Sequence, residues 1–259
     1  MKKRIISLLT ATILLLLLPL SFSGADNGTY NDAYGSTYWD STNGAYMYNQ
    51  PHYGIVICRQ LSVRNRPSTS GSSYETLTNG KPVKILGYVP QSYNGEEYYV
   101  VERAAGGFIS NTGNTSYGYV KASLVKMDPE FIFADRLLNL YTTPWGDGQK
   151  NGEQRNRYFL VLSQYSNWYA VQTMESNPGT SFIRSSDIYS SYYSKKVVVV
   201  WDTDLYDEES MYKIQSVSRF TSGRQVDVSG GYTLVVFNEG APNEFRAWIN
   251  TMYIARVIN

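Results

Sequence analysis

Short apolar runs of four to six residues alternate with polar turns along most of the chain, and the runs are rich in Val, Ile, Tyr and Phe. Gly, Asn, Ser and Pro separate them, as they separate short β-strands. No window shows the apolar spacing of three and four residues, with capping residues, that marks an amphipathic helix. The pattern therefore predicts an all-β fold.

The strand pattern occurs three times in succession. Each copy closes with an aromatic residue followed by an aliphatic one, and the aliphatic residues Val120, Ile183 and Ile249 are 63 and 66 residues apart. The strands before these segments recur in the same register, and they span 98–102, 168–172 and 232–236. A period longer than the 20 to 50 residues of solenoid repeats predicts tandem small domains, each with its own core.

The repeat sets the expected domain boundaries. We expect small barrels over 54–126, 131–189 and 197–259, the third of which has diverged most. Domains near this size bury only about 60% of the surface of their unfolded chains, so packing between neighbours should help to stabilise them.

The N-terminus has the features of a secretory leader. A basic end at residues 2–4, an apolar core at 13–18 and small residues at 23–25 predict a signal peptide over 1–25. Cleavage is expected after Ala25, or alternatively after Ser23. An uncleaved membrane anchor is the other interpretation, but the apolar stretch is short and contains Pro19. The protein is thus expected to be secreted or associated with the cell wall, without stable membrane insertion.

Residues 26–53 are rich in Tyr, Asn, Gly and Ser and contain hardly any aliphatic side chain. Such a segment cannot bury enough apolar area to offset its chain entropy, so the composition predicts a disordered tether. In the alternative interpretation, its aromatic rings contact glycan or another wall polymer.

Charge and cysteine content narrow the classes of partner. The chain has 23 Lys and Arg against 22 Asp and Glu, and removal of the leader leaves 20 against 22. This near neutrality argues against a nucleic-acid partner, because phosphate binding requires a basic face. Cys58 is the only cysteine, so no internal disulfide can form.

Catalytic and metal-binding chemistry finds little support in the residues. Cys58 and His52, the only histidine, could form a nucleophilic pair, but the repeats leave no length for a catalytic module around them. One His and one Cys cannot complete a zinc site. The acidic run 202–209 lacks the glycine and terminal Glu of a calcium loop. We expect no catalytic residue, metal or cofactor.

Two copies carry motifs of a known family. Leu61 to Pro67 reads Leu-Ser-Val-Arg-Asn-Arg-Pro and is followed later by Gly118-Tyr119-Val120; Leu138 to Pro144 and Trp168 to Val171 are a second match. These segments resemble the bacterial SH3-type (SH3b) domain, which implies tandem SH3-like β-barrels. The third copy lacks the arginine and proline of the motif, and Arg64 is replaced by Tyr141 and Tyr206 in copies two and three.

The resemblance also implies a ligand groove beside the opening segment. We expect Arg64, Asn65 and Arg66 to act as polar anchors. The aromatic walls of this groove are predicted to be Tyr93, Tyr98 and Tyr117. Aromatic residues make up 15% of the chain, and exposed Tyr rings offer flat amphipathic faces to sugars or extended peptides.

These features together predict a secreted, non-catalytic protein that binds a cell-wall polymer or extended peptide. Peptidoglycan peptide or cross-bridge is the expected ligand, with avidity arising from the repeated modules. The alternatives are a scaffold for other exported proteins and a cell-wall enzyme of unrecognised type.

Overall fold

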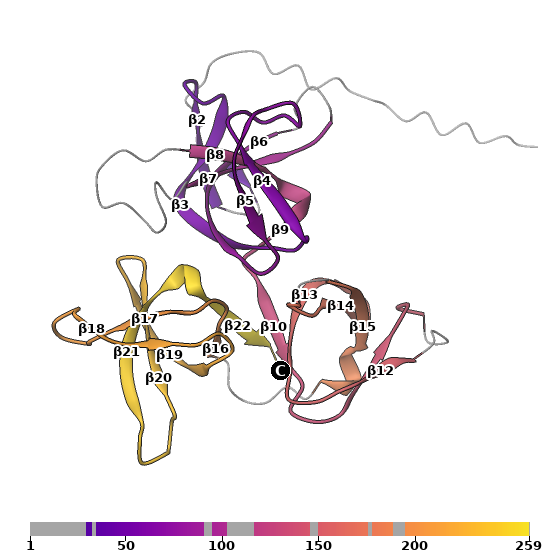
Figure 1. The fold of residues 1–259 in the computed structure, drawn as a ribbon, viewed down its shortest axis with the longest axis vertical. Coiled ribbons are helices and arrows are strands. Elements are labelled where there is room, and N and C mark those ends of the chain that lie inside the picture. Colours follow the sequence, from indigo (N-terminus) through magenta and orange to yellow (C-terminus); the bar gives the residue numbers. More distant parts are fainter. Residues whose placement is uncertain are drawn as a thin grey trace, which may run out of the picture.

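The computed structural model describes residues 30–32, 35–90, 95–102, 117–145, 150–175, 178–188 and 195–258. These residues form strands β1 to β22 and three short 3-10 helices, η1 to η3, with no α-helix among them (Figure 1). The described part of the chain contains no helix that could cross a bilayer. The all-β prediction is confirmed. The expected leader over 1–25 and the expected groove residue Tyr93 lie outside the described residues.

Three units of similar topology follow one another, and we call them modules 1, 2 and 3. Module 1 spans 54–127 and contains the end of β3 (Ala45–Val56), β4 (Gln60–Arg64), β5 (Ser73–Thr78), β6 (Pro82–Val89), β7 (Tyr98–Glu102), β8 (Tyr117–Lys121), η1 (Ala122–Leu124) and β9 (Val125–Met127). Module 2 spans 130–188 and contains β10 (Glu130–Phe133), β11 (Leu138–Tyr141), β12 (Lys150–Gln154), β13 (Tyr158–Tyr165), β14 (Trp168–Gln172), β15 (Thr180–Arg184) and η2 (Ser185–Asp187).

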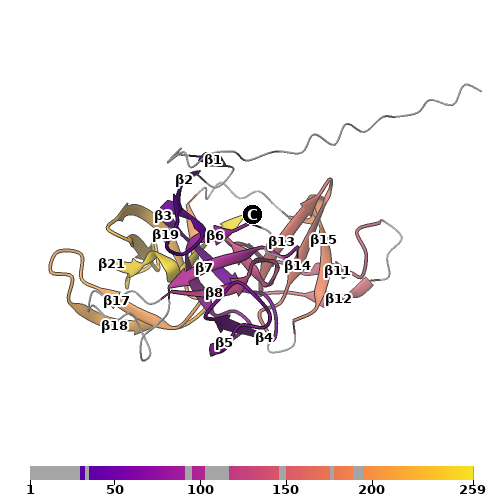
Figure 2. The ribbon, with the colours of Figure 1, turned by 90° about the horizontal axis from the view of Figure 1, so that it is seen from above.

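Module 3 spans 196–258. Its elements are β16 (Lys196–Val199), β17 (Thr203–Tyr206), β18 (Lys213–Val217), β19 (Ser222–Ser229), β20 (Tyr232–Phe237), β21 (Phe245–Asn250), η3 (Thr251–Tyr253) and β22 (Ile254–Ile258). Figure 1 shows modules 2 and 3 side by side with module 1 above them, and Figure 2 shows module 1 lying across the line between the other two.

Strand pairing repeats residue by residue in the three modules. The last residue of each opening strand pairs with the closing strand, as Arg64 with Tyr119, Tyr141 with Phe182, and Tyr206 with Trp248. A register shift recurs in the central hairpins, after Ile85, Val161 and Gln225. A 3-10 helix follows the closing strand each time. The pairing therefore follows the register inferred from the sequence.

Each module has a core of its own. Val120, Ile183 and Ile249, the aliphatic residues of the closing segments, are completely buried. They belong to three separate clusters, which lie in modules 1, 2 and 3 respectively. The period-two alternation of the closing strands explains this, because it points one residue of each aromatic-aliphatic pair inward.

A fourth apolar cluster lies where the three modules meet. Its buried members come from every module and are Ile55, Phe131, Leu160, Val198, Val200, Ala255 and Val257. Polar contacts add to this junction, since the Gln172 side chain donates to the carbonyl of Ile57 and to Oδ1 of Asn79. The modules thus pack against one another around shared apolar side chains.

Strand β22 belongs to two modules. It pairs antiparallel with β16 of module 3 and parallel with β10 of module 2. In module 1 the position beside the first strand is instead filled by that module's own β9, which pairs with the end of β3. The shared strand joins modules 2 and 3 into one sheet of 13 strands, whereas module 1 belongs to a separate sheet of nine.

The prediction of a disordered tether over 26–53 is wrong for residues 30–32 and 35–53. Strand β2 (Gly35–Asp40) pairs with β3, and β1 (Tyr30–Asp32) pairs with β2. The two strands β2 and β3 form what we call the N-terminal hairpin. The hairpin has little aliphatic content of its own, but it packs on the sheet of module 1. Ala45 and Met47 are buried there, and Tyr46 stacks on Tyr88 with ring centroids 5.4 Å apart.

Candidate binding sites

The polar anchors expected in module 1 hold their own loop. Nη1 of Arg64 donates to the carbonyl oxygen of Gly71 at 2.6 Å, and Nη2 of Arg66 donates to that of Ser70 at 3.2 Å. Asn65 is exposed, and its backbone N–H donates to the carbonyl of Ser72. The two arginines therefore close the loop over 65–72.

Of the aromatic walls expected in module 1, the structure describes Tyr98 and Tyr117, and these two do not line an open groove. Tyr98 is only 2% exposed, so the prediction that it presents a ring to a ligand is wrong. Burial raises the pKa of its hydroxyl. Tyr117 is partly buried against the same cluster. The cause is the N-terminal hairpin, whose Ala45 and Met47 cover this sheet face.

A hydrogen bond adds to the closure of this face. The Tyr119 hydroxyl donates to the carbonyl oxygen of Asn43, in the turn of the N-terminal hairpin, at 3.3 Å. Tyr119 is 8% exposed, and burial raises its pKa. We call the side of the β7–β8 sheet that lies opposite the module's own core its outer face. In module 1 this outer face is covered by the N-terminal hairpin.

In module 2 the equivalent outer face carries a cluster of two rings and a cation. Trp168 occupies the position of Tyr98. The rings of Trp168 and Tyr141 pack edge to face, with their centroids 5.1 Å apart. The Arg184 guanidinium lies 5.1 Å from both ring centroids. Trp145, in the loop after β11, is 70% exposed. Trp168 itself is only 9% exposed, with Tyr141 and Arg184 lying against its ring.

Module 3 repeats the arrangement with three rings. Tyr206 and Tyr232 meet edge to face with centroids 5.6 Å apart, and Tyr206 pairs with Trp248. All three are partly exposed. The indole Nε1 of Trp248 donates to the carbonyl of Glu208 at 3.2 Å, which fixes the loop over 207–212 beside the face. Tyr212, at the end of this loop, is 78% exposed.

Asp207 orders the same loop. Its carboxylate accepts hydrogen bonds from the backbone N–H and the hydroxyl of Ser210, which lower the pKa of Asp207. The backbone N–H of Asp207 also donates to the carbonyl of Tyr212 at 2.8 Å. Sequence reasoning missed Tyr212 and Trp145 as candidate contacts. Trp145 and Tyr212 lie in the loops that follow Tyr141 and Tyr206, the equivalents of Arg64, but at different distances from them, so the repeat did not single them out.

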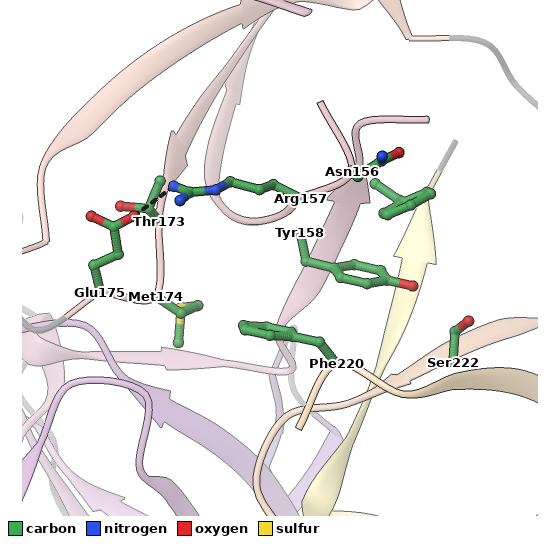
Figure 3. A pocket seen from close by; sticks show the side chains of 9 residues that line it. Asn156, Arg157, Tyr158, Thr173, Met174, Glu175, Phe220 and Ser222 are labelled. Atoms are coloured by element: carbon green, nitrogen blue, oxygen red, sulfur yellow. Dashed lines mark hydrogen bonds and ion pairs between the residues drawn. The ribbon is translucent and has the colours of Figure 1, made fainter. Parts of the chain in front are cut away.

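A hollow of about 520 Å³ lies at the junction of modules 2 and 3 (Figure 3). Its lining residues come from the end of β10, the turn before β13 and the start of that strand, the segment after β14, and the turn before β19 with the start of that strand. They are Phe133, Asn156, Arg157, Tyr158, Thr173, Met174, Glu175, Phe220 and Ser222. The side chains of Arg157 and Glu175 form an ion pair of 2.5 Å at its edge. A second hollow, of about 460 Å³, lies in module 1 beside the Glu96–Lys121 ion pair.

The potentially reactive side chains have other partners. His52 Nδ1 lies 2.9 Å from Oδ2 of Asp128, and the Cys58 thiol donates to the carbonyl of Gln60 at 3.3 Å. Burial raises the pKa of Cys58, which favours the thiol over the nucleophilic thiolate. In the described part of the chain, no three His, Cys, Asp or Glu side chains gather as they would around a metal ion.

No family model matches the chain, and no curated protein matches it in sequence. Among solved structures, NlpC2 from Trichomonas vaginalis is similar at 8% identity, over 82% of this chain and 99% of that one, with a TM-score of 0.23. NlpC1 from the same organism gives 9% identity, coverage of 81% and 94%, and a TM-score of 0.22. At such TM-scores the two proteins say nothing about the function of this chain.

Proposed function

We propose that this chain is an exported, non-catalytic protein that binds cell-wall material through the outer faces of modules 2 and 3. The proposed ligand is an extended peptide of peptidoglycan, either stem peptide or cross-bridge. The observation that carries the proposal is the contrast between faces: the rings of Tyr98 and Tyr119 are buried in module 1, whereas their equivalents in module 3 are partly exposed, with Tyr212 exposed beside them. In module 2 the equivalent Trp168 is buried, but Trp145 is exposed in the loop after β11.

Aromatic faces of this kind suit extended ligands. Rings fixed by edge-to-face contacts lose little entropy on binding, and grooves lined by such rings hold peptides in many small β domains. Two faces on one chain increase the apparent affinity, because the second contact forms at an effective concentration of about 1 mM. Each face can therefore bind weakly while the protein is retained on a polymer that repeats its ligand.

Retention on isolated cell walls tests the proposal. Purified protein is mixed with walls and sedimented, and the bound fraction is measured over a range of protein concentrations. We expect Trp145→Ser and Tyr212→Ser each to weaken retention about fivefold, and the double variant to weaken it more than tenfold, because loss of one face also removes the avidity. Both side chains are largely exposed, so the fold should be unaffected.

Tyr38→Ser is the matched control, because Tyr38 is a 50% exposed aromatic residue on the N-terminal hairpin and lies on neither face. Its retention should equal that of the unaltered protein. The proposal is rejected if the unaltered protein stays in the supernatant at every salt concentration. It is also rejected if all three aromatic variants are retained equally. A stoichiometric protein partner from culture supernatant, without wall retention, would instead indicate a scaffold.

A further inference from the structure

We infer that the hollow between modules 2 and 3 is a second binding site, which accepts a neutral sugar ring of a glycan. It is separate from the outer faces proposed above, and it differs from them in the class of ligand. Its volume of about 520 Å³ falls in the range of about 300–1,000 Å³ typical of small-molecule sites. Four observations support the assignment.

The first observation is the residue at the turn before β19. Phe220 has φ +67°, and the equivalent residues Gly80 and Asn156 have φ +81° and +55°. Their equivalence is clear from the backbone, because each N–H donates to the carbonyl of a residue at or directly after the end of the first strand of its own module, namely Val56, Ala134 or Val199. Gly and Asn tolerate this region, whereas a bulky side chain there is uncommon. Module 3 thus keeps a Phe where the backbone disfavours it.

The second observation is that the Phe220 ring is only partly used for packing. It lies nearly parallel to Tyr158, at 10°, with centroids 5.7 Å apart, so the two rings are offset. Phe220 remains 38% exposed and lines the hollow. The Arg219 guanidinium lies 4.7 Å from its centroid but is not among the lining residues. One part of the ring therefore faces the hollow, as Figure 3 shows.

The third observation is the charge of the polar side. Arg157 and Glu175 contribute one positive and one negative charge, paired at 2.5 Å, and both are about half exposed. Ser222, Thr173 and Asn156 add neutral donors and acceptors. The hollow thus has polar groups without net charge on one side and aromatic rings on the other. This arrangement suits a neutral ligand that has hydroxyl groups at its edges and an apolar face. A pyranose ring has this chemistry, and the charges of the lining residues cancel; the Arg219 and Lys196 cations lie against the Phe220 and Phe133 rings.

The fourth observation separates a sugar from an extended peptide. Peptides that add to a sheet need a strand with an unpaired edge. The strands that line the hollow have none: β10 pairs with β13 and β22, β13 with β10 and β14, and β19 with β16 and β20. Recognition here must therefore come from side chains, which favours a ring-shaped ligand.

Calorimetric titration of the whole protein with chitotetraose, a neutral tetramer of N-acetylglucosamine, tests the assignment. Maltotetraose and pentaglycine serve as a second sugar and as a peptide. We expect chitotetraose to bind with a Kd of about 1 mM or lower, and Phe220→Gly to weaken binding at least tenfold. Gly relieves the backbone strain at this position, so the melting temperature of the variant should stay close to that of the unaltered protein.

Asn238→Gly is the matched control, because Asn238 also has a positive φ, +53°, in an exposed turn of module 3 away from the lining. Its sugar affinity should be unchanged. A second variant, Arg157→Gln with Glu175→Gln, should weaken binding about fivefold without touching the rings. If Phe220→Gly proves unstable, the affinity of this second variant for chitotetraose tests whether the sugar binds in the hollow.

Three outcomes would overturn the inference: no heat with either sugar, unchanged sugar affinity in the Arg157/Glu175 variant, or binding of pentaglycine that depends on Phe220. Failure here is distinguishable from failure of the proposed function. Phe220→Gly should leave wall retention dependent on Trp145 and Tyr212, and the Trp145 and Tyr212 variants should bind chitotetraose normally.

Discussion

Modules 1 and 3 share their strand pairing but differ in what lies on their outer faces. In module 1, Tyr98 and Tyr119 are buried beneath the N-terminal hairpin. In module 3, the equivalent rings of Tyr232 and Trp248 are partly exposed. The same position in the repeat thus serves as interior in one copy and as surface in another.

This difference shows that motif strength and accessibility are separate properties. Module 1 contains the segment that most resembles the motif described in the sequence analysis, Leu61 to Pro67, yet its arginines bond to their own loop and its rings are covered. Modules 2 and 3 replace Arg64 with Tyr141 and Tyr206, and the rings of the outer face are partly exposed in module 3, while in module 2 Trp168 is buried and Trp145 is exposed. The strand that closes each module offers a second comparison, because β9 serves module 1 alone and β22 serves two modules.

The largest effect is expected from a charge in the shared strand. Val257 is 4% exposed in the central cluster and pairs with Phe131 of module 2. Val257→Asp should cost about 4 kcal/mol, because an unpaired carboxylate cannot be solvated there. Peptide-resolved hydrogen exchange should show loss of protection in both modules 2 and 3. Loss confined to module 3 would contradict the sharing of β22. Arg256→Gln, on the exposed side of the strand, is the control.

The hairpin of module 1 can be displaced by a bulky residue. Ala45 is fully buried against the outer face, so Ala45→Arg should cost about 3 kcal/mol through overpacking and charge burial. Hydrogen exchange should then increase in β7 and β8 while modules 2 and 3 stay protected. Tyr38→Ser on the same hairpin should change nothing. Equal protection of β7 and β8 in Ala45→Arg and the unaltered protein would mean that the hairpin does not close this face.

A smaller effect is expected where module 1 meets module 2. Asn79 is 8% exposed, donates to the carbonyl of Glu175 at 2.7 Å and accepts from Gln172. Asn79→Ala should lower the free energy of unfolding by about 1–2 kcal/mol, because it leaves buried polar partners unsatisfied. The equivalent residue of module 2, Arg155, is exposed. Arg155→Ala should therefore change the free energy of unfolding by less than about 0.5 kcal/mol. Denaturant titration of both variants measures this, and similar losses for Asn79→Ala and Arg155→Ala would contradict a special role of the buried Asn79.

The smallest effect depends on pH. Hydrogen bonds from Lys213 and Ser216 lower the pKa of Asp204 below its ordinary 3.8. The ionised carboxylate therefore stabilises the fold above the unfolded pKa, and this contribution is lost as pH falls through the folded pKa. Asp204→Asn copies Asn139, the equivalent residue of module 2. It should cost a few tenths of a kcal/mol at pH 7, given the exposure of the pair, and progressively less as pH falls through the folded pKa. A pH-independent difference would exclude this explanation.

The repeat was predictable because it rests on local chemistry. Closing residues such as Val120 and Ile249 recur in register, and period-two alternation places them in the cores. The N-terminal hairpin was not predictable from composition, since Ala45 and Met47 become buried only against Tyr98 and Tyr119 of another segment. The groove prediction failed at Tyr98 for the same reason.

The parallel pairing of β10 with β22 and the hollow at the module junction also escaped sequence reasoning. Both depend on how complete modules pack, and packing between modules leaves no periodic pattern in the sequence. The unusual residue at the junction could nevertheless have been noticed from the repeat, because Phe220 aligns with Gly80 and Asn156 at a turn that favours small or polar residues.

The position of β22 in the chain also bears on the order of folding. Of the described strands it is the last to leave the ribosome, and until then β10 of module 2 has an unpaired edge that carries Phe131 and Ile132. Exposed apolar edges of nascent chains are prone to mispairing between molecules. A polypeptide that crosses a membrane before folding would bring both strands to the far side together. The topology thus favours folding after translation over folding module by module during synthesis.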